Sequence, residues 1–166
     1  MSEFCRLVEE QIPRLRRYAR ALIRMNQSAA DDLVQETLTR AVAKQHLWEP
    51  GTNLRAWLFT LMHNQHVNDV RRSVREGTTV DIDDVQNAMA SQSDASASML
   101  LRDLERGLAA LAIEQRQVIL LVGLEGMSYE ETAAVLGVPV GTVRSRLSRG
   151  RDALRKLMDM DMDMAA

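Results

Sequence analysis

A dense run of positive charge near the C-terminal end is the first feature that could do chemistry. Positions 144 to 156 carry five arginines and one lysine against one acid, Asp152, in a chain of 166 residues whose formal net charge is -2. Guanidinium groups pair with phosphates and with guanine edges. A cluster of them in an otherwise acidic protein therefore predicts contact with nucleic acid, the alternative being a solvated basic face without a ligand.

The charge is unevenly distributed along the chain. Residues 1–75 balance at +4, residues 76–138 at -8 and residues 139–158 at +5. Two basic segments thus flank an acidic middle, and this asymmetry says more about partners than the total charge does.

Other chemistries find little support in the sequence. His63 and His66 have the spacing of a metal pair on a helix, but no Cys, Asp or Glu at ligand spacing accompanies them, so we expect no metal and no cofactor. The sequence contains no recognisable nucleophile–base pair and no Gly-rich phosphate loop, so nothing in it indicates an enzyme. One cysteine, Cys5, fits a cytoplasmic protein, and the lack of a long apolar run predicts no membrane insertion.

Composition and periodicity predict an all-α fold of two small helical domains joined by a flexible acidic linker. Aromatic residues make up only 4% of the chain, and apolar residues recur at helical spacing. The predicted units are a first domain, an acidic linker, a second domain with a helix-turn-helix, and a frayed acidic tail, over 1–76, 77–98, 99–158 and 159–166. The predicted helices cover 2–25, 28–48, 53–75, 99–111 and 114–122, with Ser28 and Asn53 as N-caps of the second and third.

The helix-turn-helix follows from local signals between positions 128 and 139. Ser128 and Glu131 form a capping box, in which each side chain accepts from the other residue's amide. Gly137 is expected in the left-handed conformation that ends a helix, and Pro139 as the first residue of the next. A short helix, a glycine turn and a longer basic helix are typical of this motif.

A helical wheel divides the last helix into an inner and an outer face. The inner stripe comprises Val143, Leu147, Gly150, Leu154 and Leu157. The residues predicted to read bases on the outer face are Arg144, Ser145, Ser148 and Arg149, and those predicted to contact phosphate are Arg146, Arg151, Arg155 and Lys156.

The third predicted helix offers a second nucleic-acid face. Its polar candidates are Arg55, His63, Asn64, His66, Arg71, Arg72 and Arg75. Trp57 is expected in the core, whereas Phe59 and Val70 either pack on another helix or stack on an unpaired base.

Three stretches together resemble the extracytoplasmic-function (ECF) sigma factors of bacterial RNA polymerase. They are DDLVQETLTRAVAKQHLW, PGTNLRAWLFTLMHNQHVNDVRR and MSYEETAAVLGVPVGTVRSRLSRGRDALRKL. The resemblance covers about Leu7 to Met158. It implies an alternative sigma factor that binds core polymerase and directs promoter-specific transcription initiation, in a stress or envelope response under the control of an anti-sigma factor.

The resemblance also implies roles for individual positions. Contact with core polymerase, through its beta-prime coiled coil, falls on Asp31, Asp32, Gln35, Glu36 and Arg40, while the beta flap is a further expected core contact. Recognition of the −10 element falls on Asn53, Arg55, His63, Asn64, Arg71 and Arg72. Recognition of the −35 element falls on Thr142, Arg144, Ser145, Arg146, Ser148, Arg149, Arg151 and Arg155.

The reach of the linker also predicts a role for it. A relaxed coil of this length is too short to join the two promoter elements, so the linker is expected to be extended only on polymerase, where the family implies a path through a nucleic-acid channel. Off polymerase, we hypothesise that the acidic linker folds the two basic halves together and masks them.

Three rival functions remain open at this point. A sigma-like decoy would sequester an anti-sigma factor, but it would not need the basic faces that this chain keeps. A dimeric helix-turn-helix repressor would need a dimer surface, and no extra helix supplies one. A nucleic-acid-modifying enzyme would need a catalytic site, and the sequence offers no candidate.

Overall fold

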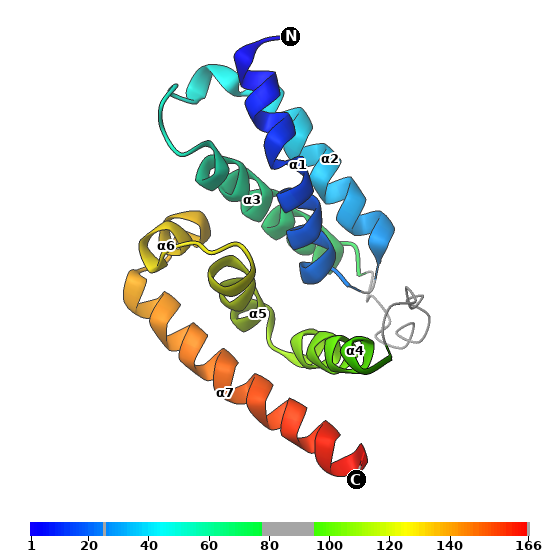
Figure 1. Ribbon diagram of the computed structural model, residues 1–166. Helices are drawn as coiled ribbons and strands as arrows, with labels where there is room; N and C mark the ends of the chain where they lie inside the picture. The colour runs from blue at the N-terminus through cyan, green and yellow to red at the C-terminus, as the bar shows by residue number, and fades with distance from the viewer. Residues whose placement is uncertain (25, 78–94, 166) are drawn as a thin grey trace.

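The computed structural model describes residues 1–24, 26–77 and 95–165, and every regular element in these ranges is helical. This confirms the predicted all-α class. In chain order the elements are α1 (Glu3–Leu22), α2 (Gln27–Ala43), the short 3-10 helix η1 (Gln45–Leu47), α3 (Leu54–Arg75), α4 (Ala95–Ala110), α5 (Ile113–Ile119), the π-helical η3 (Leu120–Leu124), α6 (Tyr129–Leu136) and α7 (Val140–Ala165) (Figure 1).

Helices α1, α2 and α3 pack on one another around an apolar core. Ser2 caps α1 by accepting from the amide of Cys5, and Val8, Leu15 and Leu22 are buried along the inner side of that helix. The ring of Phe59 on α3 meets the ring of Tyr18 on α1 edge to face, with centroids 5.2 Å apart. Aromatic pairs favour this geometry, and the pair contributes to the packing of α3 on α1.

The burial of Phe59 decides between the two roles considered for it. Its side chain is 1% exposed, so it packs in the core and is not available to stack on a base. Val70 is 48% exposed on the last third of α3. Trp57 is partly buried and lies edge to face against Phe4, 6.2 Å away, which agrees with its predicted place in the core.

The second helix starts and ends earlier than its sequence predicts. Asn26, not Ser28, is the N-cap: its side-chain oxygen accepts from the amide of Ala29 at 3.0 Å. The prediction was wrong because Asn and Ser are about equally good N-cap residues. The neighbouring sequence therefore does not decide whether the helix starts at Asn26 or at Ser28. At the other end the α-helix stops at Ala43, and η1 replaces the predicted last turn. Asn53 caps α3 as predicted.

The linker predicted over 77–98 lies largely outside the described residues. Gly77 has a φ of +67°, so it does end α3 as expected. Residues 78–94 are not described, whereas Ala95 to Ser98 already belong to α4, which begins earlier than predicted.

The helix-turn-helix forms in the second half, between α6 and α7. Ser128 caps α6 by accepting from the amide of Glu131 at 3.0 Å, and Gly137 has a φ of +68°. Two details differ from the prediction. The side chain of Glu131 bonds to Arg55 rather than back to Ser128, and Pro139 precedes the first residue of α7 while its carbonyl accepts from Thr142.

Helix α7 is held by the inner stripe that the wheel predicted. Val143, Leu147 and Gly150 are buried. A Cβ placed on Gly150 would lie 2.9 Å from Cδ1 of Ile119, so glycine allows α5 and α7 to approach closely. The acidic tail, expected to fray, continues as helix to Ala165.

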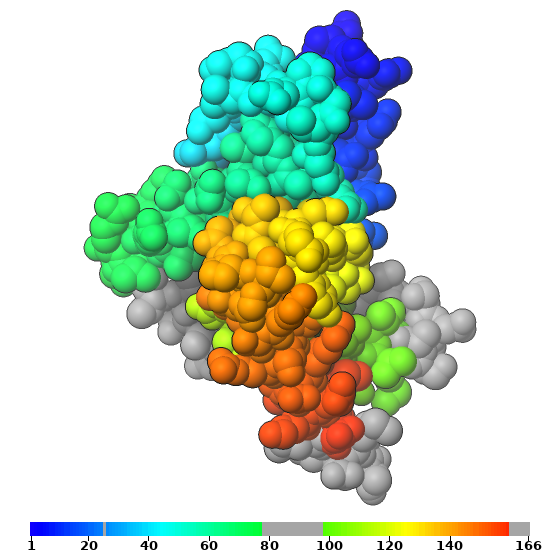
Figure 2. All heavy atoms as spheres, turned by 90° about the vertical axis from the view of Figure 1, so that its left-hand side faces the viewer, coloured from blue at the N-terminus to red at the C-terminus, as the bar shows by residue number. Residues whose placement is uncertain are grey.

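The two halves of the chain pack directly against each other. Helix α3 lies against α6, and α1 lies against α5 and η3 (Figure 1). Seen from the side, the atoms of the helix-turn-helix meet those of α3 without a gap (Figure 2). Direct helix contacts therefore bring together the halves that the linker was expected to fold together.

Candidate nucleic-acid interface

The outer face of α7 is a basic surface supported by a buried stripe. Arg144, Ser145, Ser148 and Arg149, the predicted base readers, are all exposed. Arg151, Arg155 and Lys156 are exposed along the following two turns, and Thr142 and Arg146 are partly buried at the edge. A helix that presents arginines outward from its first turns, immediately after a glycine turn, has the form of a recognition helix.

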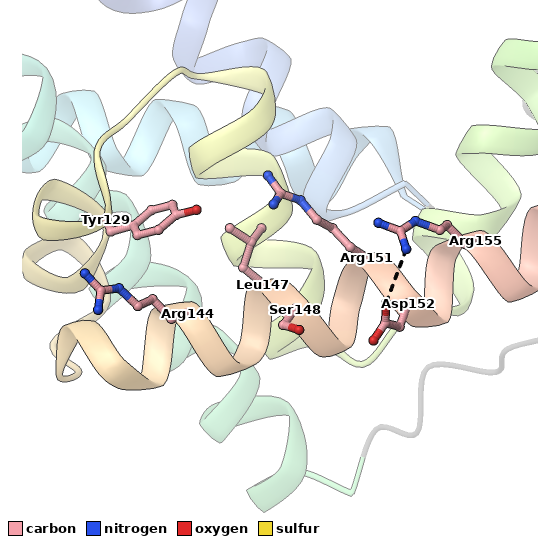
Figure 3. Close-up of a pocket in the computed structure, with 7 residues that line it drawn as sticks. All are labelled: Tyr129, Arg144, Leu147, Ser148, Arg151, Asp152 and Arg155. Carbon is pink, nitrogen blue, oxygen red and sulfur yellow. Dashed lines mark ion pairs between the residues drawn. The ribbon is translucent and has the colours of Figure 1, made fainter.

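Arg144 is oriented by an aromatic ring on the neighbouring helix. Its guanidinium carbon lies 6.0 Å from the centroid of the Tyr129 ring, at the start of α6. The arrangement is a cation–π contact across the helix-turn-helix. The side chain of Arg144 extends from α7 towards this ring (Figure 3).

Tyr129 and Arg144 also border a shallow basic hollow on this surface. Its other lining residues are Leu147, Ser148, Arg151, Asp152 and Arg155 (Figure 3). Asp152 forms an ion pair with Arg155 at 3.5 Å, and both side chains are mostly exposed. Because exposed pairs are weak, a phosphate can replace Asp152 as the partner of Arg155 at little cost.

Ser145 has a restricted role in any base contact. Its hydroxyl donates to the carbonyl of Gly141 at 2.9 Å. The proton is therefore engaged within the helix, and the hydroxyl oxygen offers its lone pairs outward, which suits a donor on a base edge.

The predicted −10 residues lie along α3, but the structure does not leave them equally accessible. Asn64, Arg71 and Arg72 are exposed. Asn53 is exposed while its side-chain oxygen caps α3. Arg55 is partly buried and faces the second half of the chain.

The guanidinium of Arg55 has two partners, both beyond the junction between the halves. It donates to the carbonyl of Glu125 at 2.9 Å and to the carboxylate of Glu131 at 3.4 Å. In this closed arrangement Arg55 is thus not presented to a ligand.

The two histidines of α3 also meet charges from the second half. Burial lowers the pKa of His63 below its ordinary value, and the nearby charges of His66 and Arg146 lower it further. Burial likewise lowers the pKa of His66, with Asp69 opposing the shift and Arg116 adding to it. Both rings therefore favour the neutral form. Among the described residues, no three His, Cys, Asp or Glu side chains are placed to share a metal ion.

The predicted core-binding residues occupy one exposed side of α2. Asp31, Asp32, Gln35 and Glu36 are exposed, and Arg40 is partly buried. Arg40 pairs with Glu36 at 3.1 Å, and Asp31 lies 3.6 Å from Arg20 of α1. Asp32 and Gln35 form no bond to another helix among the described residues, and both side chains are exposed.

Two functional candidates at the junction were missed by sequence reasoning. Arg17 on α1 donates to the buried carboxylate of Glu125 at 3.1 Å, although 108 positions separate the two residues. The only signal in the sequence was the opposite charge of the segments that contain them.

Two protein-family models match the chain over separate ranges. Residues 8–63 match the model described as the Sigma2 domain of PhyR, and residues 101–154 match the model described as Sigma-70, region 4.

No helix in the described part of the chain has the length and apolarity to span a bilayer.

Similar proteins match the chain over both halves at once. The ECF RNA polymerase sigma factor EcfG of Rhodopseudomonas palustris is 40% identical over 90% of this chain and 82% of its own length. The ECF RNA polymerase sigma factor SigE of Mycolicibacterium smegmatis is 36% identical over 93% of this chain and 61% of its own length.

A solved structure matches the fold in one superposition. The sigma factor RpoE from Bartonella quintana, in a co-crystal with the anti-sigma factor NepR, is 38% identical to this chain with a TM-score of 0.81, over 97% of this chain and 99% of that one. CnrH, in complex with the cytosolic domain of CnrY, is 30% identical with a TM-score of 0.69, over 95% of this chain and 88% of that one.

Proposed function

This chain belongs to the extracytoplasmic-function family of RNA polymerase sigma factors, and we propose that it binds core polymerase through α2 and directs it to promoters through α3 and α7. The observation that carries the proposal is the outer face of α7. Its exposed arginines lie on the side of the helix opposite the buried stripe, and the helix follows directly after a glycine turn. In this assignment α1 to α3 form the region 2 domain, and α4 to α7 form the region 4 domain. The protein acts in the cytoplasm by binding, without catalytic chemistry or a cofactor of its own.

The region 4 domain recognises the −35 element. The first turns of α7 enter the major groove, where Arg144, Ser145 and Arg149 reach base edges. The arginines further along the helix contact phosphates, which position the helix without reading sequence. The remaining candidates of this surface are Thr142, Arg146, Ser148, Arg151 and Arg155.

The region 2 domain recognises the −10 element and carries the core-binding surface. Asn64, Arg71 and Arg72 are exposed along α3 and suit contacts with an opened strand. Asp32 and Gln35 are exposed on α2 and suit contacts with the beta-prime coiled coil. The beta flap is a further expected core contact.

We also propose that an anti-sigma factor controls this protein. RpoE, whose co-crystal partner is an anti-sigma factor, superposes on both halves of this chain together. The closed arrangement seen here is therefore one that an anti-sigma factor can recognise. A stress or envelope signal that removes this partner would release the sigma factor.

A second candidate is an anti-sigma decoy, and one observation favours it. The model that matches residues 8–63 describes a domain of PhyR, and PhyRSL from Sphingomonas sp. Fr1, in complex with NepR, is 26% identical with a TM-score of 0.66. A decoy does not need a DNA-reading surface. The exposed arginines of α7 therefore favour the sigma-factor assignment.

Reconstituted transcription separates the two candidates. The purified chain is mixed with bacterial core polymerase and a library of promoter fragments, and run-off products are sequenced. A sigma factor yields transcripts that share two sequence elements, and the yield depends on the added chain. A decoy yields none, and tight binding to an operator by a free dimer would instead indicate a repressor.

A further inference from the structure

One acid interrupts the positively charged face of α7. Asp152 is the only Asp or Glu between positions 139 and 158, a stretch that also holds six Arg and Lys residues. It lies one helical turn beyond Ser148 and two turns beyond Ser145, so it shares the outer face with two of the predicted base readers. Its side chain is 63% exposed, and it therefore faces whatever this surface binds.

The ion partner of Asp152 lies on the same helix. Its carboxylate oxygen Oδ1 is 3.5 Å from Nη1 of Arg155, whose side chain is also exposed (Figure 3). Charge-assisted hydrogen bonds between guanidinium and carboxylate are usually shorter, at about 2.7–2.9 Å. An exposed pair at the longer distance contributes little to the stability of the helix. The packing of α7 rests instead on the buried Val143, Leu147 and Gly150.

The same two residues line the basic hollow that α6 and α7 border. Arg144 and Arg151 line it as well, so three guanidinium groups and a single carboxylate meet there. Its volume of about 230 Å³ is several times the roughly 30 Å³ of a water molecule, and this leaves room for a phosphate group. Phosphates accept paired N–H donors from guanidinium as carboxylates do. A DNA phosphate and the carboxylate of Asp152 are therefore alternative partners for Arg155.

The place of Asp152 along α7 decides which part of DNA it meets. The helix begins at Val140, so Asp152 lies about 18 Å further along its axis at 1.5 Å per residue. A recognition helix contacts base edges with its N-terminal residues, whereas its later turns lie beside backbone phosphates. At this distance from the helix start, a carboxylate opposes the binding of phosphate.

We propose that Asp152 restrains the affinity of the region 4 domain for DNA of any sequence, because its carboxylate holds Arg155 in the place of a backbone phosphate. This deepens the proposed function and rests on it, since it gives a role to a further residue of the same surface. Duplex DNA displaces the carboxylate before Arg155 contacts a phosphate. The displacement lowers the affinity for all promoters alike, and sequence preference stays with the first turns of α7.

Two variants remove the charge of Asp152 in different ways. Asp152→Asn keeps the size of the side chain, and Asn and Asp have similar helix propensities. Asp152→Ala introduces a strong helix former and excludes an effect of the new amide group. Circular dichroism checks that both chains keep the helix content of the parent. Holoenzymes assembled with each chain are then titrated by fluorescence anisotropy against a panel of duplex −35 variants at two salt concentrations.

A second ion pair in the same half of the chain supplies a matched control. Asp103 and Arg106 have the same spacing as Asp152 and Arg155, and they pair at 2.8 Å on α4. Neither residue lines the basic hollow. Asp103→Asn therefore removes one negative charge and frees one arginine away from the proposed phosphate site. A general effect of charge on DNA binding would appear in this variant too.

The Asp152 variants are expected to gain affinity uniformly. At the lower salt both should bind every duplex of the panel about twofold to fivefold more tightly than the parent, which is the range of one exposed ion pair. The decrease of affinity with salt should steepen by up to about one unit of log–log slope, because Arg155 then acts as a full phosphate contact. Asp103→Asn should bind like the parent. In an Arg155→Ala background, Asp152→Asn should bring no gain, because the arginine that it releases is missing.

Three results would overturn the proposal. They are the absence of a gain in both Asp152 variants, an equal gain in Asp103→Asn, and a gain that persists without Arg155, which would indicate direct repulsion of phosphate. A loss confined to one −35 base pair would instead make Asp152 a reader of cytosine, whose amino group carboxylates accept from. A parent holoenzyme without sequence preference on the panel contradicts the proposed function itself. A parent that shows the preference, with variants that gain nothing, contradicts only the restraint.

Discussion

The guanidinium of Arg144 lies over the ring of Tyr129, 6.0 Å from its centroid, and so ties the recognition helix to the first residue of α6. The contact spans the glycine turn of the helix-turn-helix and borders the basic hollow of Figure 3. It makes Tyr129 a positioning residue for an arginine that is expected to contact promoter DNA.

Tyr129→Leu should therefore weaken −35 binding through Arg144. An exposed cation–π contact contributes about 0.5–1 kcal/mol, so holoenzyme affinity for duplex promoter should fall about twofold to fivefold. Tyr129→Phe keeps the ring and should bind like the parent, as measured by fluorescence anisotropy on promoter fragments selected in run-off assays. Equal losses in the two variants would assign the effect to the hydroxyl instead.

Arg149 and Arg155 should differ in what they read. Arg149→Ala should cost about 1–3 kcal/mol, concentrated at one −35 position, if its guanidinium binds guanine with two hydrogen bonds. Arg155→Ala should weaken binding to all sequences alike and reduce the salt slope by about one unit. Titrations of holoenzyme against a panel of −35 variants at two salt concentrations test both. A uniform loss for Arg149→Ala would make it a phosphate contact.

Asp32 and Gln35 should act on polymerase rather than on DNA. Both are exposed on α2 and take no part in the ion pairs that tie α2 to α1 or to itself. The double change to Ala should reduce core pull-down while leaving helix content and oligonucleotide binding unchanged. Undiminished assembly would move the core-binding surface away from this part of α2.

Gly150 should be required for the packing of α7 on α5. A Cβ at this position would lie 2.9 Å from Cδ1 of Ile119 and 3.2 Å from Cβ of Gln115, so Gly150→Ala overpacks the contact. We expect a loss of about 1–3 kcal/mol in the free energy of unfolding, measured by urea denaturation. Gly141→Ala, whose Cβ would meet nothing within 4 Å, is the control and should be neutral or slightly stabilising. If both changes stabilise the protein alike, helix propensity outweighs packing at this site.

Acid should destabilise the junction between the halves through His63 and His66. Burial holds the pKa of each ring below its ordinary value near 6.5, and Arg146 and Arg116 lower it further, while Asp69 partly opposes the shift at His66. The unfolded chain then binds more protons than the folded chain as the pH falls through 6.5, so stability decreases below that pH. Thermal unfolding between pH 7.5 and 5.5 should show this trend, and His63→Gln with His66→Gln should flatten it. A slope unaffected by the double change would place the acid sensitivity at other groups.

Local signals made the ends and faces of most helices predictable. Asn53, Ser128 and Gly137 act on amides or φ angles within a few residues, so their roles can be read from neighbouring letters. The inner stripe of α7 followed from helical spacing alone, and with it the exposed arginine face. Local reasoning failed where two local choices were equivalent, as for Asn26 and Ser28.

Only the tertiary structure decided which of these exposed groups are free. Arg55 was predicted to contact nucleic acid, and Glu131 was predicted to complete a capping box. In the structure these two residues bond to each other, although 76 positions separate them in the sequence. Arg17 and Glu125 meet because α1 packs on η3, and Phe59 is buried because α3 crosses Tyr18. Helical periodicity determines which side of a helix is apolar. Which partner covers that side, and which charges it brings, depends on contacts between distant segments that no local pattern encodes.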